Sequence, residues 1–210
     1  MNKTKNKILE ASLRMFNENG VEKITLRQIS KEIGISQGNL NYHFPKKSEI
    51  VISLYTDLVL SLDEKFSLFK KEDLSLTDLY YNNVELIGSF FEYRFILLDF
   101  RQIMTDYPEI KKNYLWLQEK RKEQFLELMD VLIHNKIIRE EEYSGEYENL
   151  HIRLTIIGDF WMTYAELRDE LSGDSWKSNY SFYLLEILYP YLSTKGKEEF
   201  TALREYIKSE

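Results

Sequence analysis

The amino-acid sequence predicts an all-α protein, and three observations support this prediction. Only three prolines and eight glycines occur in 210 residues, which leaves little room for long loops. Apolar residues recur at spacings of three and four through most of the chain, as on one face of a helix. Several such stretches begin with a serine or threonine flanked by an apolar pair, the pattern of a helix N-terminus.

The first expected helix covers residues 3–19. Ile8, Leu9, Leu13 and Phe16 fall on one face of it, and Gly20 follows as the residue that closes it. We expect this helix to pack across the two short helices that come next.

Two short helical patterns lie within residues 25–44, and each has its own start signal. Thr25 and Gln28 have the spacing of a capping box, with Ile24 and Ile29 as the hydrophobic staple around it. Gly34 is expected to end this helix, because glycine tolerates the left-handed conformation found there.

The second helix of this pair begins at once. Ser36 is its expected N-cap, Ile35 and Leu40 form its staple, and Pro45 ends it by restricting the residue before it. Two short helices joined by so tight a turn predict a helix-turn-helix, whose second helix can lie in the major groove of DNA.

The composition of the second helix favours contact with DNA. Gln37, Asn39 and Asn41 carry amides, which can bond bidentately to adenine, and Gly38 is small. An ordinary helical hairpin with a polar outer face is the alternative, but the repeated cap and staple favour DNA binding.

The first fifty residues resemble the DNA-binding domain of the tetracycline-repressor (TetR) family of bacterial regulators. The rest of the chain resembles the family only in length and helical pattern. One departure is Asn41, where many relatives carry an aromatic residue. The matching pieces are ILEASLRMFNENG (8–20), the Thr25 cap, QISKEIGIS (28–36) and GNLNYHFPKKSEI (38–50).

Residues 1–50 are the expected helix-turn-helix DNA-binding domain, and the resemblance implies which of them contact bases and which contact the DNA backbone. The bases of a palindromic double-stranded operator would be read by Gln37, Asn39 and Asn41, with Gly38 on the same surface. The DNA backbone would be contacted by Thr25, Arg27, Tyr42, His43 and Lys47.

The charge distribution agrees with this interpretation. Residues 1–50 hold nine Lys/Arg and five Asp/Glu, a net charge of +4, whereas residues 51–210 hold nineteen and thirty, a net charge of −11. The basic part is therefore the part with the motif, which orients the molecule toward a polyanion.

The remaining residues, 51–210, are expected to form a helical effector-binding and dimerisation domain. Ser75 has a cap position with a Leu74/Leu79 staple, and Pro108 suits a first helical turn. The helices predicted after the DNA-binding motif cover residues 47–71, 74–106 with a break near Gly88, 108–135, 147–171, 176–192 and 197–208.

This second domain is rich in aromatic residues, which line many ligand pockets but also fill ordinary cores. The resemblance implies a pocket for a small, mostly apolar effector that releases a repressor from its operator. The candidate pocket residues are Tyr81, Phe91, Tyr114, Trp116, Phe125, Phe160 and Trp161.

The two long helices near the C-terminus are apolar on more than one face, so each needs two partners. We expect one face to meet the core and the other to form a homodimer through a four-helix bundle. The candidate interface residues are Ile156, Thr163, Phe182 and Ile187.

Enzymatic readings have little support. Glu148 and His151 have the Glu-x-x-His spacing of half a di-iron site, but no second copy exists, and the chain has no cysteine. We therefore expect no catalytic residues, no metal and no cofactor.

No signal peptide or membrane span is evident, so we expect a cytoplasmic protein. The competing functions are a ligand-independent DNA-binding regulator and, more distantly, a helical metal-dependent enzyme.

Overall fold

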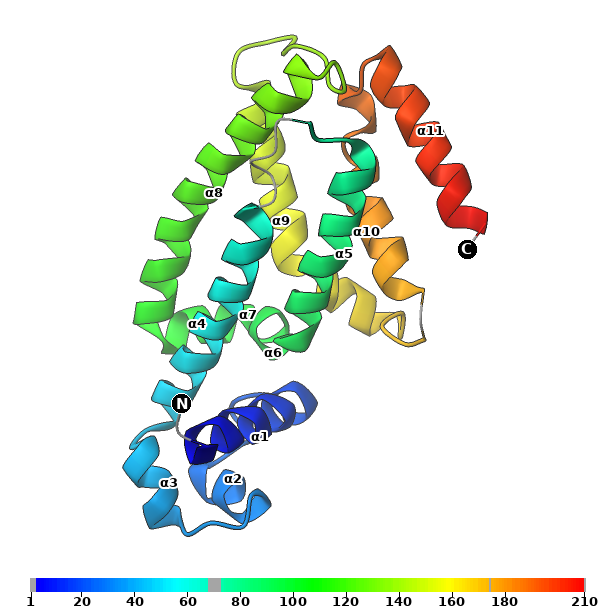
Figure 1. The fold of residues 1–210 in the computed structure, drawn as a ribbon. Helices are drawn as coiled ribbons and strands as arrows, with labels where there is room; N and C mark the ends of the chain where they lie inside the picture. Colours follow the sequence, from blue (N-terminus) through cyan, green and yellow to red (C-terminus); the bar gives the residue numbers. More distant parts are fainter. Residues whose placement is uncertain (1–2, 68–72, 174, 210) are drawn as a thin grey trace. The chain divides into compact units, whose positions relative to one another are not determined.

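The computed structural model describes residues 3–67, 73–173 and 175–209, and the regular structure of these residues is helical (Figure 1). The expected all-α architecture, a helix-turn-helix followed by a helical C-terminal part, is confirmed. The elements are α1 Lys3–Asn19, α2 Leu26–Glu32, α3 Gln37–His43, α4 Lys47–Phe66, α5 Leu76–Glu92, α6 Phe95–Leu98, α7 Phe100–Asp106, α8 Pro108–His134, α9 Glu146–Leu167, α10 Trp176–Glu186, the 3₁₀ turn η2 Tyr189–Tyr191 and α11 Thr194–Ser209.

The chain divides into two compact units. The first unit joins Met1–Ser61 to Phe90–Tyr114, and the second joins Leu62–Ser89 to Leu115–Glu210. Helices α4, α5 and α8 therefore each contribute residues to both units. The helix-turn-helix consequently shares its compact unit with a segment that lies far along the chain.

The core of the first unit shows why these distant segments associate. Phe16 of α1 and Phe95 of α6 are both almost fully buried, and their ring centroids lie 5.4 Å apart. Aromatic rings of this size supply much of a small core. Other fully or nearly fully buried apolar residues of this unit are Ile8, Ile29, Leu40, Phe44, Ile50, Val51, Leu54, Ile103 and Ile110.

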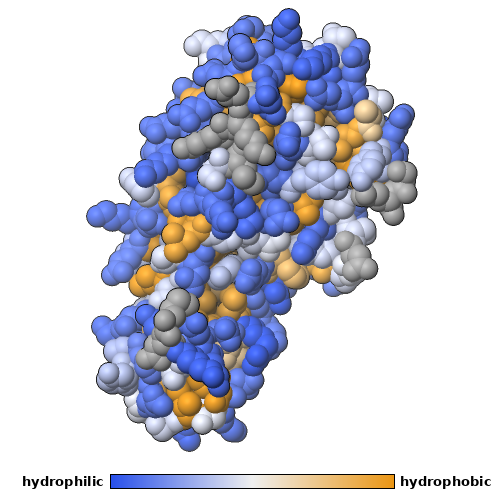
Figure 2. All heavy atoms as spheres, viewed as in Figure 1, coloured by the Kyte–Doolittle hydropathy of each residue, from blue (hydrophilic) through white to orange (hydrophobic). Residues whose placement is uncertain are grey.

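The second unit is built around one apolar cluster. It draws on α5, α8, α9, α10 and α11, with Leu76, Leu132, Leu150, Leu185 and Phe200 among its buried members. An isolated antiparallel bridge between Ile138 and Leu192 joins the connector after α8 to the segment before α11. The face of each unit visible in Figure 2 is mainly hydrophilic, with hydrophobic residues in separate patches.

Several helix boundaries differ from expectation. The predicted break near Gly88 is wrong, because α5 continues through it to Glu92, and the helical path is interrupted instead before Phe95 and at Asp99. The expected end of the helix over residues 47–71 falls partly on residues 68–72, which lie outside the described residues; α4 itself ends at Phe66.

The C-terminal boundaries also shift. Helix α9 ends at Leu167, and Asp169 takes the left-handed conformation (φ 56°) after it, as glycine does at many helix ends. The expected helix over residues 176–192 stops at Glu186 and gives way to a 3₁₀ turn at Pro190. Proline has no N–H to continue the helical ladder, which accounts for this ending.

Gly196 provides a test of the packing in the second unit. A methyl group at this position would lie 2.1 Å from the carbonyl oxygen of Ile137, a backbone atom. We expect Gly196→Ala to lower the free energy of unfolding by about 1–3 kcal/mol, the range for overpacking. Urea denaturation at a fixed protein concentration measures this change.

The matched control is Gly158→Ala in α9, where the added methyl group meets nothing within 4 Å. This substitution should instead stabilise the helix by up to about 1 kcal/mol. Similar effects of the two substitutions would contradict the close approach of Gly196 to the Ile137 backbone.

Candidate nucleic-acid interface

The start of α2 is fixed by the side chains that the sequence indicates. The Thr25 Oγ1 accepts a hydrogen bond from the Gln28 backbone N–H at 3.3 Å, and the Gln28 Oε1 accepts one from the Thr25 N–H at 2.8 Å. The predicted capping box is therefore confirmed. Because these bonds satisfy backbone donors that a helix N-terminus leaves unpaired, they define where α2 begins.

The turn between α2 and α3 depends on Gly34. Its φ is 71°, and its N–H donates to the Lys31 carbonyl while the Ile35 N–H donates to the Ser30 carbonyl. These two bonds are the pair that defines a Schellman motif. The tight turn holds α3 at a fixed angle to α2, as the predicted helix-turn-helix requires.

Helix α3 buries one residue and presents the others. Ser36 Oγ accepts from the Asn39 N–H at 3.2 Å, and Leu40 is completely buried beneath the helix. The side chains of Gln37, Asn39 and Asn41 are exposed, as is the backbone at Gly38. Within the described part of the chain no hydrogen bond to these three amides is made, so they are available to base edges.

Residues at the edges of this surface carry groups of the kind that bind phosphate. Thr25 and Arg27 are exposed, and Tyr42 is 83% exposed with its ring edge-to-face with that of His43, at 5.2 Å between centroids. His43 is half-buried. Hydroxyl, guanidinium and imidazole groups at the rim of a recognition helix can donate to phosphate oxygens.

Lys47 is placed differently from the other candidate phosphate contacts. Its Nζ donates to the carbonyls of Val21, at 2.8 Å, and Ile24, at 3.0 Å. Burial lowers the pKa of this ammonium, while the carboxylates of Glu22 and Asp106 oppose that shift. Two of its three donors are thus used within the protein, where they brace the loop before α2.

The seven predicted pocket residues are dispersed in the structure. Tyr81 and Trp116 are about half exposed, and the ammonium of Lys120 lies 3.8 Å from the Trp116 ring centroid. Phe91 and Tyr114 belong to the first unit, while Phe125 lies against His151 in the second. Only Phe160 and Trp161 line one described cavity.

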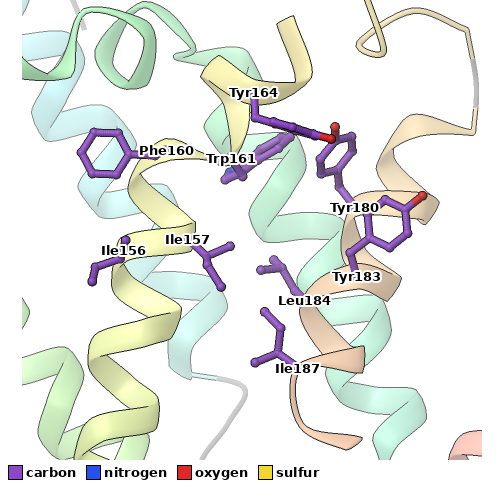
Figure 3. Close-up of a pocket in the computed structure, with 9 residues that line it drawn as sticks. All are labelled: Ile156, Ile157, Phe160, Trp161, Tyr164, Tyr180, Tyr183, Leu184 and Ile187. Atoms are coloured by element: carbon purple, nitrogen blue, oxygen red, sulfur yellow. The ribbon is translucent and has the colours of Figure 1, made fainter. Parts of the chain in front are cut away.

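That cavity is a groove of about 360 Å³ between α9 and α10 (Figure 3). Two of the candidate dimer residues, Ile156 and Ile187, also line it. The sequence prediction did not include Tyr180, Tyr183 and Leu184 as lining residues. Their spacing of three and four positions places them on one face of α10, and this pattern could have indicated a shared surface. The complete lining is Ile156, Ile157, Phe160, Trp161, Tyr164, Tyr180, Tyr183, Leu184 and Ile187.

The other two candidate dimer residues have different surroundings. Thr163 is exposed on α9, on the same face as Ile156. Phe182 packs against the core cluster of its own unit, with its ring 5.3 Å from that of Phe200 in α11.

The half-motif for a metal site has other contacts. Glu148 forms an ion pair with Lys122 at 2.8 Å, and His151 packs on Phe125. Among residues 3–67, 73–173 and 175–209, no group of three or more His, Asp or Glu side chains is placed to hold a metal ion. No helix in these same ranges is long and apolar enough to cross a membrane.

The fold and this surface define a helix-turn-helix DNA-binding protein with a helical C-terminal part. Family profiles described as "Bacterial regulatory proteins, tetR family" and "Bacterial transcriptional repressor" match residues 8–54 and 59–200. The second match alone covers more than half of the chain. The protein therefore belongs to the TetR family of DNA-binding transcriptional regulators, which are not enzymes.

Individual relatives agree with this assignment. An HTH-type transcriptional regulator of Staphylococcus aureus (strain USA300) is 34% identical over 95 residues, which cover 45% of this chain and 46% of the relative. The matched region thus spans less than half of that relative's length.

Solved structures show the same fold. A TetR-family transcriptional regulator from Marinobacter aquaeolei VT8 aligns with a TM-score of 0.88 at 23% identity, over 98% of this chain and 99% of that one. A putative transcriptional regulator from Saccharomonospora viridis, solved in complex with choline, aligns with a TM-score of 0.69 at 16% identity, over 92% and 99% of the two chains. At these identities the likeness concerns the fold alone.

Proposed function

We propose that the protein is a homodimeric repressor that binds a palindromic operator and leaves it when a small, mostly apolar effector binds. The observation that carries the DNA-reading part is the exposed set of amides on α3, at Gln37, Asn39 and Asn41. A two-fold dimer presents this set twice, which matches two half-sites one helical turn apart.

The homodimer is supported by an apolar stripe on α9. Ile156 is 55% exposed and Leu167 is 82% exposed, and soluble proteins rarely leave such residues together on one helix face without a partner. A second copy of the chain is the proposed partner, because a self-complementary stripe can pair with itself across a two-fold axis. The stripe consists of Ile152, Ile156, Phe160, Thr163 and Leu167.

The groove between α9 and α10 fits the same proposal. It is lined only by aliphatic and aromatic side chains, with Trp161 and Tyr180 forming its inner wall at 4.9 Å between ring centroids (Figure 3). An apolar side chain of the second copy, inserted between these helices, would bury a central anchor of the kind that dominates interface energetics.

The effector is supported by Asn82 on α5. Only 6% of this residue is exposed, and neither Oδ1 nor Nδ2 has a hydrogen-bond partner among the described residues. An unpaired buried amide costs about 1–3 kcal/mol, so a ligand that supplies one neutral donor or acceptor would recover this energy. The choline complex of a relative with the same fold supports a small organic molecule as the class of effector.

Asn82→Leu tests this part of the proposal. The substitution removes the unpaired amide while keeping a similar volume, so it should raise the free energy of unfolding of the ligand-free protein by about 1–3 kcal/mol. Urea denaturation measures the stability, and native mass spectrometry of the purified protein measures any small molecule retained. Wild-type protein should retain a molecule that the variant does not.

Asn83→Leu is the control, because Asn83 is the half-buried neighbour on the same helix and should gain no comparable stability. If Asn82→Leu destabilises the protein and neither protein retains a molecule, Asn82 does not hold an effector.

A ligand-independent regulator is the second candidate function. It is favoured by the dispersal of the predicted pocket residues, of which only Phe160 and Trp161 share a described cavity. The two candidates can be separated by unfolding the purified protein, desalting it to remove any bound small molecule, and refolding it. Operator affinity is then measured before and after this treatment. An unchanged operator affinity, with no bound molecule before or after, would favour the ligand-independent regulator.

A further inference from the structure

A residue of α1, the helix that precedes the helix-turn-helix, is hydrogen-bonded to the junction between α5 and α6. Asn17 lies in the last turn of α1, and its Nδ2 donates to the Glu92 carbonyl at 2.7 Å. Its Oδ1 accepts from the Phe95 N–H at 3.1 Å. Glu92 ends α5 and Phe95 begins α6, where helices leave carbonyls and N–H groups unpaired. The Asn17 amide therefore pairs with one backbone group at each of the two helix ends.

A second side chain connects the same two segments. Asp99, between α6 and α7, accepts a hydrogen bond through Oδ2 from the Val21 N–H at 3.3 Å. Val21 follows Gly20, whose φ of 79° turns the chain at the end of α1. A Cβ on Gly20 would lie 3.3 Å from the same oxygen, so the carboxylate is seated closely against this turn.

Lys47 holds the loop over residues 20–25 from another element. Its ammonium donates to the Val21 and Ile24 carbonyls, while Asp99 accepts from the Val21 N–H. The loop leads directly into Thr25, which caps α2. The backbone at Val21 is thus held through both its N–H and its carbonyl, by side chains from two different elements.

We propose that Asn17 and Asp99 are positioning residues for DNA recognition, which fix the helix-turn-helix to the segment 92–99. All of these contacts lie inside the first compact unit. Because α2 and α3 follow the anchored loop without a long linker, loss of the anchors would let the recognition helix shift relative to its two-fold mate. A dimer that must fit two half-sites at a fixed spacing is sensitive to such shifts. The inference rests on the proposed operator binding by a homodimer and is independent of the proposed effector.

The experiment compares Asn17→Leu and Asp99→Ala with wild-type full-length protein. Asn17→Leu keeps the volume but removes both hydrogen bonds. The matched control for it is Asn19→Leu, because Asn19 lies on the same helix, is exposed, and its amide donates to the Met15 carbonyl of its own helix and to no other group in the described parts of the chain. Asp99→Asn is the conservative variant, since its amide oxygen can still accept from the Val21 N–H.

The probe is a double-stranded DNA sequence selected by the wild-type protein from a random library. We expect Asn17→Leu and Asp99→Ala each to raise the dissociation constant about tenfold, because a recognition helix that is no longer anchored has to be ordered when DNA binds. Asn19→Leu and Asp99→Asn should remain within about twofold of wild type. Circular dichroism on each variant reports whether it is folded.

Hydrogen exchange separates positioning from a simple loss of stability. In wild-type protein, DNA should slow amide exchange over residues 92–99, which do not belong to the recognition helix, because coupling between two sites is reciprocal. In Asn17→Leu this protection should be lost while protection of residues 36–44 by DNA remains.

Two results would overturn the proposal. One is a folded Asn17→Leu variant with wild-type affinity for the selected DNA. The other is wild-type protein whose exchange over residues 92–99 does not respond to DNA, a measurement that needs no variant and stands even if the variants fail to fold.

Discussion

Ile156→Asp is expected to convert the protein from a dimer to a monomer and to abolish high-affinity operator binding. Ile156 lies in the exposed apolar stripe of α9 and lines the groove beside α10. In the proposed dimer each substitution would place a carboxylate without a partner in a dry interface, which costs about 3–5 kcal/mol. The two-fold axis places the substitution on both sides of the interface, so the effect is doubled.

Sedimentation velocity at micromolar concentration measures the assembly, and fluorescence anisotropy with selected DNA measures binding. The matched control is Leu60→Asp, because Leu60 is a similarly exposed apolar residue but lies on α4, outside the proposed interface. The control should stay dimeric. A wild-type monomer at this concentration, or a dimeric Ile156→Asp variant, would remove the dimer from the proposed function.

Phe182 is a poorer site for this test than the sequence pattern indicates. Its ring packs on Phe200 within the same unit, so a charge at residue 182 would destabilise the fold as well as any interface. Helical periodicity shows that a residue is on an apolar face, but it does not distinguish a neighbouring helix of the same chain from one of a partner.

The parts of the fold that the sequence predicts well are those specified by local chemistry. Thr25 with Gln28, Ser36 and Gly34 act on backbone groups within a few residues, so both cap positions and the intervening turn can be predicted from spacing alone. The exposure of the α3 amides can also be predicted, because a short helix that buries Leu40 on one face leaves its other faces open to solvent.

The features that could not be predicted depend on residues far apart in the chain. Asn17 bonds backbone groups more than 70 positions away, and Asp99 reaches Val21 over a similar separation. Their residue types are common on helix surfaces, so no local pattern marks them. Lys47 illustrates the same limit, since a lysine at the start of a helix is usually exposed, whereas here it is bound to two carbonyls.

Asn39→Ala is expected to remove most of the discrimination between operator and unrelated DNA. The Asn39 side chain is exposed on α3, and an amide at such a position can bond bidentately to adenine. Each lost base contact costs about 1–3 kcal/mol, and the proposed dimer carries the residue twice, so the total reaches up to about 6 kcal/mol. The helix should survive the change, because Ser36 accepts from the Asn39 backbone N–H, which alanine retains, and alanine is the better helix former.

The measurement compares affinity for the selected sequence and for scrambled DNA across a range of salt concentrations. Asn39→Ala should weaken binding to the selected sequence only and leave the salt dependence unchanged, because an amide neutralises no phosphate. Arg27→Ala is the contrasting variant, since Arg27 is exposed at the rim and should weaken binding to both DNAs. It should reduce the salt slope by about two, one for each copy of the residue in the proposed dimer. If Asn39→Ala kept the wild-type preference and affinity, base reading would have to be assigned to other residues of α3, with Gln37 and Asn41 the first to be tested.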